Sequence, residues 1–185
     1  MKIQLHTKLC LEQFNKCLSL KGDIVEFGVA FGNTTFPLAK EAQKVNKSIF
    51  AFDTFEGIPY DDSIKNEAYV KKGECRGYNI DRFIEEASKH RYYNVIPVKG
   101  LFEDTTKNIV IPNICFAWID SDIYQSTKTA WEFVEKRLVK DGIVGFHDYN
   151  FPRCPGVKMV VDTIDKETFQ IVQQQSICIF LKRVK

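Results

Sequence analysis

The stretch "DIVEFGVAFGNTT", Asp23 to Thr35, decides the fold. A β-branched and aromatic run leads into glycines and then into hydroxyl residues that favour a helix start, which is typical of a strand, a tight turn and a helix. Gly28 at the strand exit and Gly32 before the helix let the main chain turn sharply and approach a ligand closely. Their G-x-x-x-G spacing differs from the G-x-G-x-x-G of NAD and FAD sites and from the phosphate loop. It therefore predicts a ligand of another kind.

The rest of the chain alternates strand-like and helix-like segments. The remaining strand-like runs are 48–53, 94–100, 114–120, 142–149, 168–173 and 176–183, and the helix-like segments are 7–20, 33–45, 81–92, 126–138 and 156–166. This alternation predicts an α/β fold, with a doubly wound, mostly parallel, Rossmann-like sheet of about seven strands and helices on both faces. The last two runs are so close together that we expect them to pair as an antiparallel β-hairpin.

Length and composition indicate one domain that spans residues 1–185. Residues 1–21 are expected to form a lead-in helix, and the irregular segment 56–80 is either a lid over a substrate or a disordered insertion. The net charge is +2 with mixed signs along the chain, so we expect no nucleic-acid partner. No apolar run approaches a membrane span or a signal peptide, so we expect a soluble, cytoplasmic protein without membrane insertion. The six cysteines lack a C-x-x-C pair, which favours reduced and mostly buried thiols.

Two acidic residues near the glycine loop indicate the ligand. Glu26 precedes Gly28 by two positions, where a carboxylate repels phosphate and attracts an ammonium group. Asp53 ends the second strand, where an acid accepts hydrogen bonds from both hydroxyls of a ribose. A ligand with a ribose and a cationic amino-acid end fits S-adenosylmethionine.

A second acidic group follows the fourth and fifth strands. Asp120 and Asp122 end one strand and His147 and Asp148 end the next, so all four side chains are expected at the carboxyl edge of the sheet. Several carboxylates together disfavour each other's ionisation, and a divalent cation removes that conflict. Oxygen ligands favour Mg²⁺, Mn²⁺ or Ca²⁺, while a histidine moves the preference toward Mn²⁺, Fe²⁺, Co²⁺ or Zn²⁺. Asp122 is alternatively the N-cap of the following helix.

Five motifs occur together in an order that resembles the macrocin-type (TylF-like) O-methyltransferases, which are class I S-adenosylmethionine-dependent enzymes. They are "DIVEFGVAFGNTT", "FDTFEGIP", "KGLFEDT", "IDSDIYQST" and "GIVGFHDY". The resemblance implies the strand order 3-2-1-4-5-7-6 and methylation of a hydroxyl on a sugar or another small diol-containing acceptor, assisted by Mg²⁺. It also implies cofactor-binding roles for Glu26, Gly28, Gly32, Asp53, Thr54, Phe55, Gly100, Leu101, Phe102 and Asp120.

The same resemblance assigns the metal to Asp120, His147 and Asp148 and the general base to Asp122. His147 departs from the Asp-Asp pair that is usual in the family, so it either ligates through a neutral imidazole or acts as an acid/base group. Mg²⁺ is the expected ion, with Mn²⁺ or another divalent ion as the alternative.

Other functions and roles stay open at this stage. The alternatives are a metal-independent small-molecule methyltransferase with His147 or Asp122 as the base, a non-catalytic cofactor-binding module and, last, a nicotinamide-dependent oxidoreductase. The acceptor is expected to be a small molecule or a saccharide, and a homodimer is left open. Trp118 is expected in the core, and His6 and His90 on the surface.

Overall fold

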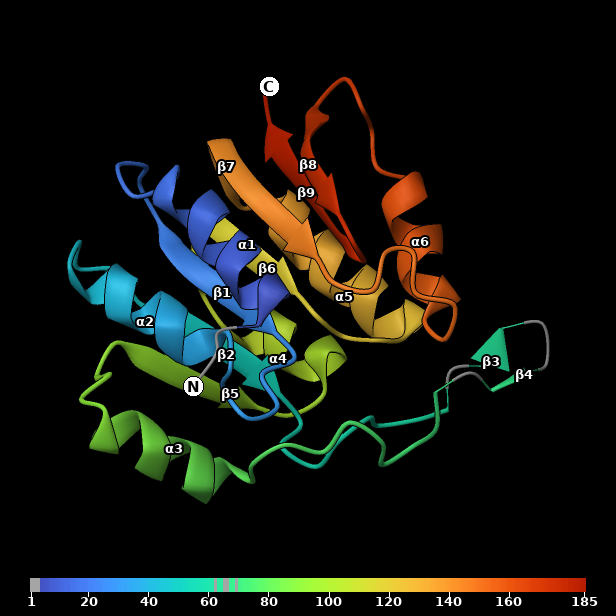
Figure 1. Ribbon diagram of the computed structural model, residues 1–185, viewed down its shortest axis with the longest axis horizontal. Helices are drawn as coiled ribbons and strands as arrows, with labels where there is room; N and C mark the ends of the chain where they lie inside the picture. The colour runs from blue at the N-terminus through green and yellow to red at the C-terminus, as the bar shows by residue number, and fades with distance from the viewer. Residues whose placement is uncertain (1–3, 62, 65–66, 69) are drawn as a thin grey trace.

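A computed structural model describes residues 4–61, 63–64, 67–68 and 70–185 of the chain. Its main sheet has seven strands in the order β5-β2-β1-β6-β7-β9-β8 (Figure 1). These strands are β1 (Asp23–Phe27), β2 (Ile49–Asp53), β5 (Val95–Lys99), β6 (Ile114–Ile119), β7 (Leu138–Phe146), β8 (Phe169–Gln175) and β9 (Cys178–Arg183).

The order of the strands confirms the predicted topology. Strands β5, β2, β1, β6 and β7 are parallel neighbours, whereas β9 pairs antiparallel with both β7 and β8. Counted along the chain within this sheet, the order is 3-2-1-4-5-7-6. The turn between β8 and β9 is short, so the expected C-terminal hairpin is present as well. All five parallel strands therefore open toward the same carboxyl edge.

Helices cover both faces of the sheet. Three of them, α1 (Leu5–Asn15), α2 (Thr35–Gln43) and α3 (Ile80–Lys89), lie on one face, and α4 (Phe102–Asn108), α5 (Tyr124–Glu135) and α6 (Pro155–Asp162) lie on the other (Figure 1). The strands bury side chains on both sides, and every residue of β6 is buried. Trp118 is fully buried, as predicted. No helix within the described ranges is both long and apolar enough to cross a membrane.

Several element boundaries differ from the sequence prediction. Helix α1 ends at Asn15 instead of Leu20, and four residues of turn follow it. Helix α4 was not predicted, because it is only seven residues long and mostly polar. Strand β7 begins at Leu138, before the expected Gly142, because Ile114 and Phe116 of β6 pair with Leu138 and Ile143 and leave an irregularity between them.

The segment 56–80 forms a paired arm in its described part. The N–H of Ile58 donates to the carbonyl of Glu74, and the N–H of Gly73 donates to the carbonyl of Ile58, so the two sides of the segment are joined near its base. Farther out, β3 (Ser63–Ile64) and β4 (Glu67–Ala68) pair antiparallel and project from the body of the protein (Figure 1). Residues 62, 65, 66 and 69 of the expected lid or insertion lie outside the described residues.

Candidate active site

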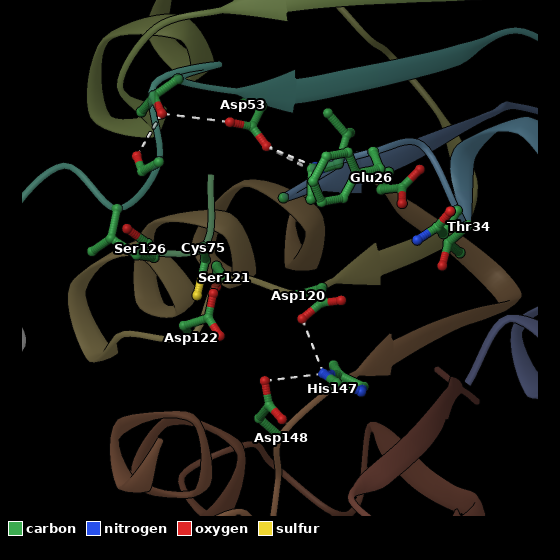
Figure 2. A pocket seen from close by; sticks show the side chains of 18 of the residues that line it. Glu26, Thr34, Asp53, Cys75, Asp120, Ser121, Asp122, Ser126, His147 and Asp148 are labelled. Carbon is green, nitrogen blue, oxygen red and sulfur yellow. Dashed lines mark hydrogen bonds and ion pairs between the residues drawn. The ribbon is translucent and has the colours of Figure 1, made fainter. Parts of the chain in front are cut away.

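One cavity of about 390 Å³ lies at the carboxyl edge of the sheet (Figure 2). Its walls come from the ends of β1, β2, β6 and β7 and from the base of the arm 56–80. Ten residues predicted from the sequence line this cavity, namely Glu26, Gly28, Asp53, Thr54, Leu101, Phe102, Asp120, Asp122, His147 and Asp148. The parallel topology therefore brings the two acidic groups of the sequence into one space.

Three predicted residues lie outside the cavity lining. A Cβ atom at Gly32 would lie 2.5 Å from the ring of Phe36, so this glycine permits close packing at the start of α2. Phe55 packs against Phe83 of α3, with ring centroids 5.3 Å apart. The N–H of Gly100 donates to the main-chain carbonyl of Asp53, which ties β5 to the end of β2.

Gly28 is required by a close approach of two main chains. It has a φ of +86°, and a Cβ atom there would lie 1.9 Å from the carbonyl oxygen of Asp120. Because this contact is with backbone, a neighbouring side chain cannot rotate to relieve it. The glycine therefore lets the turn after β1 pass directly beside the end of β6.

The Asp53 carboxylate organises the loops around it. Its Oδ2 accepts hydrogen bonds from the N–H groups of Val29, at 2.8 Å, and Ala30, at 3.2 Å, while its Oδ1 accepts one from the N–H of Phe55 at 2.7 Å. A carboxylate has about four acceptor positions, so it can still accept from a ligand hydroxyl. The acid thus joins the glycine loop to the turn after β2.

Glu26 is a buried carboxyl group for which the described part of the chain provides no counter-ion. The residue is 1% exposed, and its Oε2 atom has no hydrogen-bond partner among the described residues. Burial raises the pKa of Glu26 well above its usual range. Such a group is costly unless a ligand provides a donor or a positive charge at the cavity wall.

Asp120, His147 and Asp148 form a compact donor set. The Nδ1 atom of His147 lies 3.1 Å from Oδ1 of Asp120 and 3.0 Å from Oδ2 of Asp148 (Figure 2). Neither contact has hydrogen-bond geometry, and this Nδ1 atom is buried without a hydrogen-bond partner among the described residues. Adjacent ligands of an octahedral ion at about 2.1 Å lie about 3.0 Å apart, so these residues fit a divalent cation.

The charges in this group affect one another strongly. Burial lowers the pKa of His147, but the carboxylates of Asp120 and Asp148 outweigh it and raise that pKa to about 10. Burial, followed by repulsion from Asp120 and Asp148, raises the pKa of Asp122 to about 8. A bound cation would oppose both effects, because it disfavours the protonated histidine and favours the ionised aspartate.

Asp122 does not cap helix α5. The N-cap position belongs to Ile123, which makes no side-chain cap hydrogen bond. Strand β6 ends at Ile119, and Asp122 has a φ of +60°, so the main chain turns away from the strand before this residue. Its carboxylate nevertheless lines the cavity (Figure 2). The capping alternative is therefore wrong, whereas the role of Asp122 as a base stays a prediction.

Several cavity residues were not predicted from the sequence. His6 was expected on the surface, but it is half-buried on α1, lines the cavity and makes an edge contact with the His147 ring at 5.0 Å between centroids. The helical period contains a signal for this position, because His6 lies four residues before the buried Cys10 on the same helix face. Cys75 of the arm also lines the cavity, whereas His90 is exposed as expected.

The chain matches a known protein family over most of its length. Residues 25–149 match a family described as "Methyltransferase domain". The chain belongs to this family. The matched range contains both acidic groups of the cavity, so the methyltransferase carries its candidate active site within the family domain. Methyltransferases of this family use S-adenosylmethionine as the methyl donor. No curated protein sequence is significantly similar to this methyltransferase.

Solved structures share the fold of the methyltransferase. The O-methyltransferase NovP superposes with a TM-score of 0.81 at 20% identity, over 97% of this chain and 78% of NovP. The calicheamicin methyltransferase CalS11 gives 0.81 at 20% identity, over 97% of this chain and 80% of its own. An O-methyltransferase from Bacillus cereus in complex with SAH gives 0.69 at 16% identity, over 99% and 84%. At these identities the comparisons establish a common architecture.

Proposed function

We propose that this methyltransferase transfers the methyl group of S-adenosylmethionine to a hydroxyl of a small, neutral, diol-containing acceptor such as a saccharide. The transfer is assisted by a divalent cation bound to Asp120, His147 and Asp148. One observation carries the proposal: a single cavity joins Glu26, whose buried Oε2 atom has no hydrogen-bond partner among the described residues, to the donor set around His147. A cofactor with a cationic end and a metal-held acceptor therefore meet in one space.

The cofactor end of the cavity is formed by β1, β2 and the start of α4. Glu26 is suited to accept the ammonium group of the methionine portion, because its carboxyl group is buried and its Oε2 atom has no hydrogen-bond partner among the described residues. Three main-chain N–H groups already donate to Asp53, so about one acceptor position is left for a ribose hydroxyl, and the Thr54 hydroxyl lies 3.5 Å from Oδ1 beside it. Leu101 and Phe102 line the adjacent wall and provide apolar surface for the adenine.

The acceptor end is formed by β6 and β7. A divalent cation on Asp120, His147 and Asp148 would lower the pKa of a coordinated hydroxyl and orient the diol. Mg²⁺ suits the two carboxylates, while the imidazole extends the range to Mn²⁺ and related ions. Asp122 lies on the same wall and is suited to accept the hydroxyl proton.

Besides binding the two reactants, the chain needs to provide a proton acceptor and to align the reactants. Asp122 takes the proton as the acceptor oxygen forms its bond to the methyl carbon, and the electron pair of the broken carbon–sulfur bond stays on sulfur. The cavity walls align the two reactants and exclude water, which is the main contribution of a protein to such a displacement. The base of the arm, through Gly57, Ile58 and Cys75, forms part of those walls and is proposed to act as a lid.

The charge of the cavity favours a neutral acceptor. Among the described residues that line it, five are acidic and none is lysine or arginine. Phe31 and Phe151 line the cavity while being 47% and 38% exposed, so they provide aromatic surface at its opening. CalS11 is described as a TDP-rhamnose 3'-O-methyltransferase, which supports a saccharide here. A diphosphate would find no lysine or arginine among the described residues of the lining, which disfavours a nucleotide sugar.

The test combines binding and turnover. Calorimetry with S-adenosylhomocysteine is expected to show one site per chain, and absence of binding at millimolar ligand would refute the cofactor assignment. Methyl transfer from labelled S-adenosylmethionine to a panel of methyl glycosides is expected to require Mg²⁺ or Mn²⁺ and to stop with EDTA. Asp120→Asn is expected to abolish it, whereas Asp81→Asn, an exposed position on α3, is the matched control. Turnover that EDTA leaves unchanged would favour a metal-independent methyltransferase.

A further inference from the structure

A second group of donor atoms lies beside the first one. Asp122, Asp148 and Cys154 each offer one ligand atom, and these atoms all lie within 4.8 Å of one another. The Sγ atom of Cys154 is 3.9 Å from Oδ1 of Asp122. The three residues come from the loop after β6, the turn after β7, which ends at Phe146, and the start of α6, so the fold, and not local sequence, brings them together.

The group is buried and short of positive charge. Cys154 is 2% exposed, and the side chain of Asp148 is 6% exposed. Within the described ranges, His147 is the one basic residue at ion-pair distance from Asp148. A buried carboxylate without adequate compensation carries a large desolvation cost. The thiol and both carboxylates therefore converge on a place that suits a cation.

We propose that Asp122, Asp148 and Cys154 form a second divalent-cation site, selective for thiophilic ions such as Zn²⁺ and Cd²⁺. The site lies next to the Asp120–His147–Asp148 set and shares Asp148 with it. Around a tetrahedral Zn²⁺ with bonds of about 2.3 Å to sulfur and 2.0 Å to oxygen, the two ligand atoms lie about 3.5 Å apart. The observed 3.9 Å between Cys154 and Asp122 needs only a small side-chain adjustment to reach this value.

The donor types distinguish the two sites. The first set offers two carboxylates and an imidazole, which suit Mg²⁺ or Mn²⁺, whereas the second offers a thiol, which selects softer ions. Asp120, Asp122 and Asp148 together with a Cys154 thiolate carry four negative charges, which two divalent cations balance. A carboxylate shared between two ions is the arrangement of two-metal sites, in which the ions lie about 3.5–4 Å apart. Binding at the second site releases the thiol proton to solvent.

Occupation of the second site has a consequence for catalysis, and this part rests on the proposed function. Asp122 is the proposed base, and a carboxylate that ligates Zn²⁺ no longer has the same lone pair available for a hydroxyl proton. Thiophilic ions are therefore expected to suppress methyl transfer without displacing the cofactor. Asp122 and Asp148 both line the cavity, so the ion reaches its site from there.

The primary experiment follows Cd²⁺ binding to the full chain at a saturating concentration of Mg²⁺, in a buffer with a thiol-free phosphine reductant. A thiolate–Cd²⁺ charge-transfer band in the ultraviolet is expected for the wild type and is expected to vanish in Cys154→Ala and in the near-isosteric Cys154→Ser. Cys75→Ala is the stringent comparison, because its thiol lines the cavity and contacts the carboxyl group of Asp122, which makes it the competing thiol to distinguish from the second donor group. It is expected to keep the band. A band that survives in both Cys154 variants, or that disappears only in Cys75→Ala, would overturn the assignment.

A second measurement tests the effect on turnover. With saturating Mg²⁺, Zn²⁺ is expected to inhibit the wild type at concentrations about 10-fold or more below those needed for Cys154→Ser, since loss of even an outer-shell partner of a metal ligand costs about 10- to 100-fold in affinity. Equal inhibition of both proteins would assign the effect of Zn²⁺ to the first metal site and contradict the proposal. The Cd²⁺ band is read without turnover, so its outcome is independent of whether the proposed methyl transfer is observed.

Discussion

Oδ2 of Asp53 lies 2.8 Å from the main-chain nitrogen of Val29, so the acid at the end of β2 holds the loop that follows β1. The same carboxylate also accepts from the N–H groups of Ala30 and Phe55. Asp53 therefore shapes the cofactor end of the cavity before any ribose is present. Its substitution should affect folding and binding together.

Replacement of Asp53 by alanine is expected to lower the free energy of unfolding by about 1–3 kcal/mol, because the N–H of the buried Val29 loses its acceptor. Asp53→Asn keeps one acceptor oxygen and should cost less. Urea unfolding of both variants measures the difference, and Asp81→Asn controls for loss of an exposed acid. If Asp53→Ala were as stable as the wild type, these hydrogen bonds would contribute little in solution.

Glu26 makes stability depend on pH. Its folded-state pKa is raised by burial above the ordinary 4.5, so the folded protein holds this proton more tightly than the unfolded chain does. Its favourable contribution is therefore fully present below about pH 4.5 and is lost as the pH rises toward the folded-state pKa. Glu26→Gln is expected to remove this loss and to be more stable than the wild type near pH 8, by about 1 kcal/mol, in the absence of ligand.

The same substitution is expected to weaken cofactor binding. If Glu26 accepts the ammonium group of the cofactor, Glu26→Gln should raise the Kd for S-adenosylhomocysteine by roughly 10- to 100-fold, since a hydrogen bond to a charged group contributes about 1.5–3 kcal/mol. Urea unfolding near pH 5 and pH 8 and calorimetry are the two measurements. Unchanged affinity would remove Glu26 from the cofactor site even if the stability prediction held.

The sequence was sufficient for the sheet and for the residues at strand ends. The strand "ICFAWI" is buried throughout, and a continuous apolar run of this kind is typical of a parallel strand that is covered on both faces. Their parallel arrangement fixes the carboxyl edge, which is why Asp120 and His147 could be placed together although 27 positions separate them. The parallel topology therefore brings residues that are far apart in the sequence into one site.

The features that the sequence does not predict depend on contacts between secondary-structure elements. The position of Asp122 before a helix is typical of an N-cap. In the structure its main chain has a left-handed conformation, which aspartate tolerates, and the chain turns before the helix begins. The polar neighbours of His6 in the sequence predict a surface position, whereas in the fold α1 brings this residue into contact with His147. The sequence does not single out Cys154 among the six cysteines, because only tertiary packing brings it beside Asp122.

Gly28→Ala is expected to be strongly destabilising. The new Cβ atom would lie 1.9 Å from the carbonyl oxygen of Asp120, and the φ of +86° is unfavourable for alanine. Main chain must move, and we expect a loss of about 2–4 kcal/mol together with impaired binding of metal and cofactor. Gly73→Ala is a useful comparison, because its φ is also positive while, among the described atoms, Nη2 of Arg76 approaches the new Cβ most closely, at 3.6 Å. Similar losses in both variants would assign the effect to φ alone.

The acidic lining predicts a preference between two classes of acceptor. A methyl glycoside with a vicinal diol should be methylated with a higher kcat/KM than the corresponding nucleotide diphosphate sugar, because the described part of the cavity lining holds five acids and no lysine or arginine. Competition between the two acceptors in one reaction measures the ratio directly. A nucleotide sugar that wins this competition would show that cations outside the lining bind the diphosphate.

His147 is expected to set the choice of metal. The imidazole Nδ1 lies about equally far from Asp120 and Asp148, and softer ions than Mg²⁺ accept nitrogen readily. His147→Asp replaces it with the oxygen donor that is usual in the resembling family, so the ratio of activity with Mg²⁺ to activity with Mn²⁺ should rise, by roughly 10-fold. His147→Ala should weaken both ions, and Asp81→Asn should change neither. Both activities are measured on the same variant, so general damage to the fold cancels in their ratio. If His147→Asp had the same ratio as the wild type, the imidazole would not be a ligand of the ion.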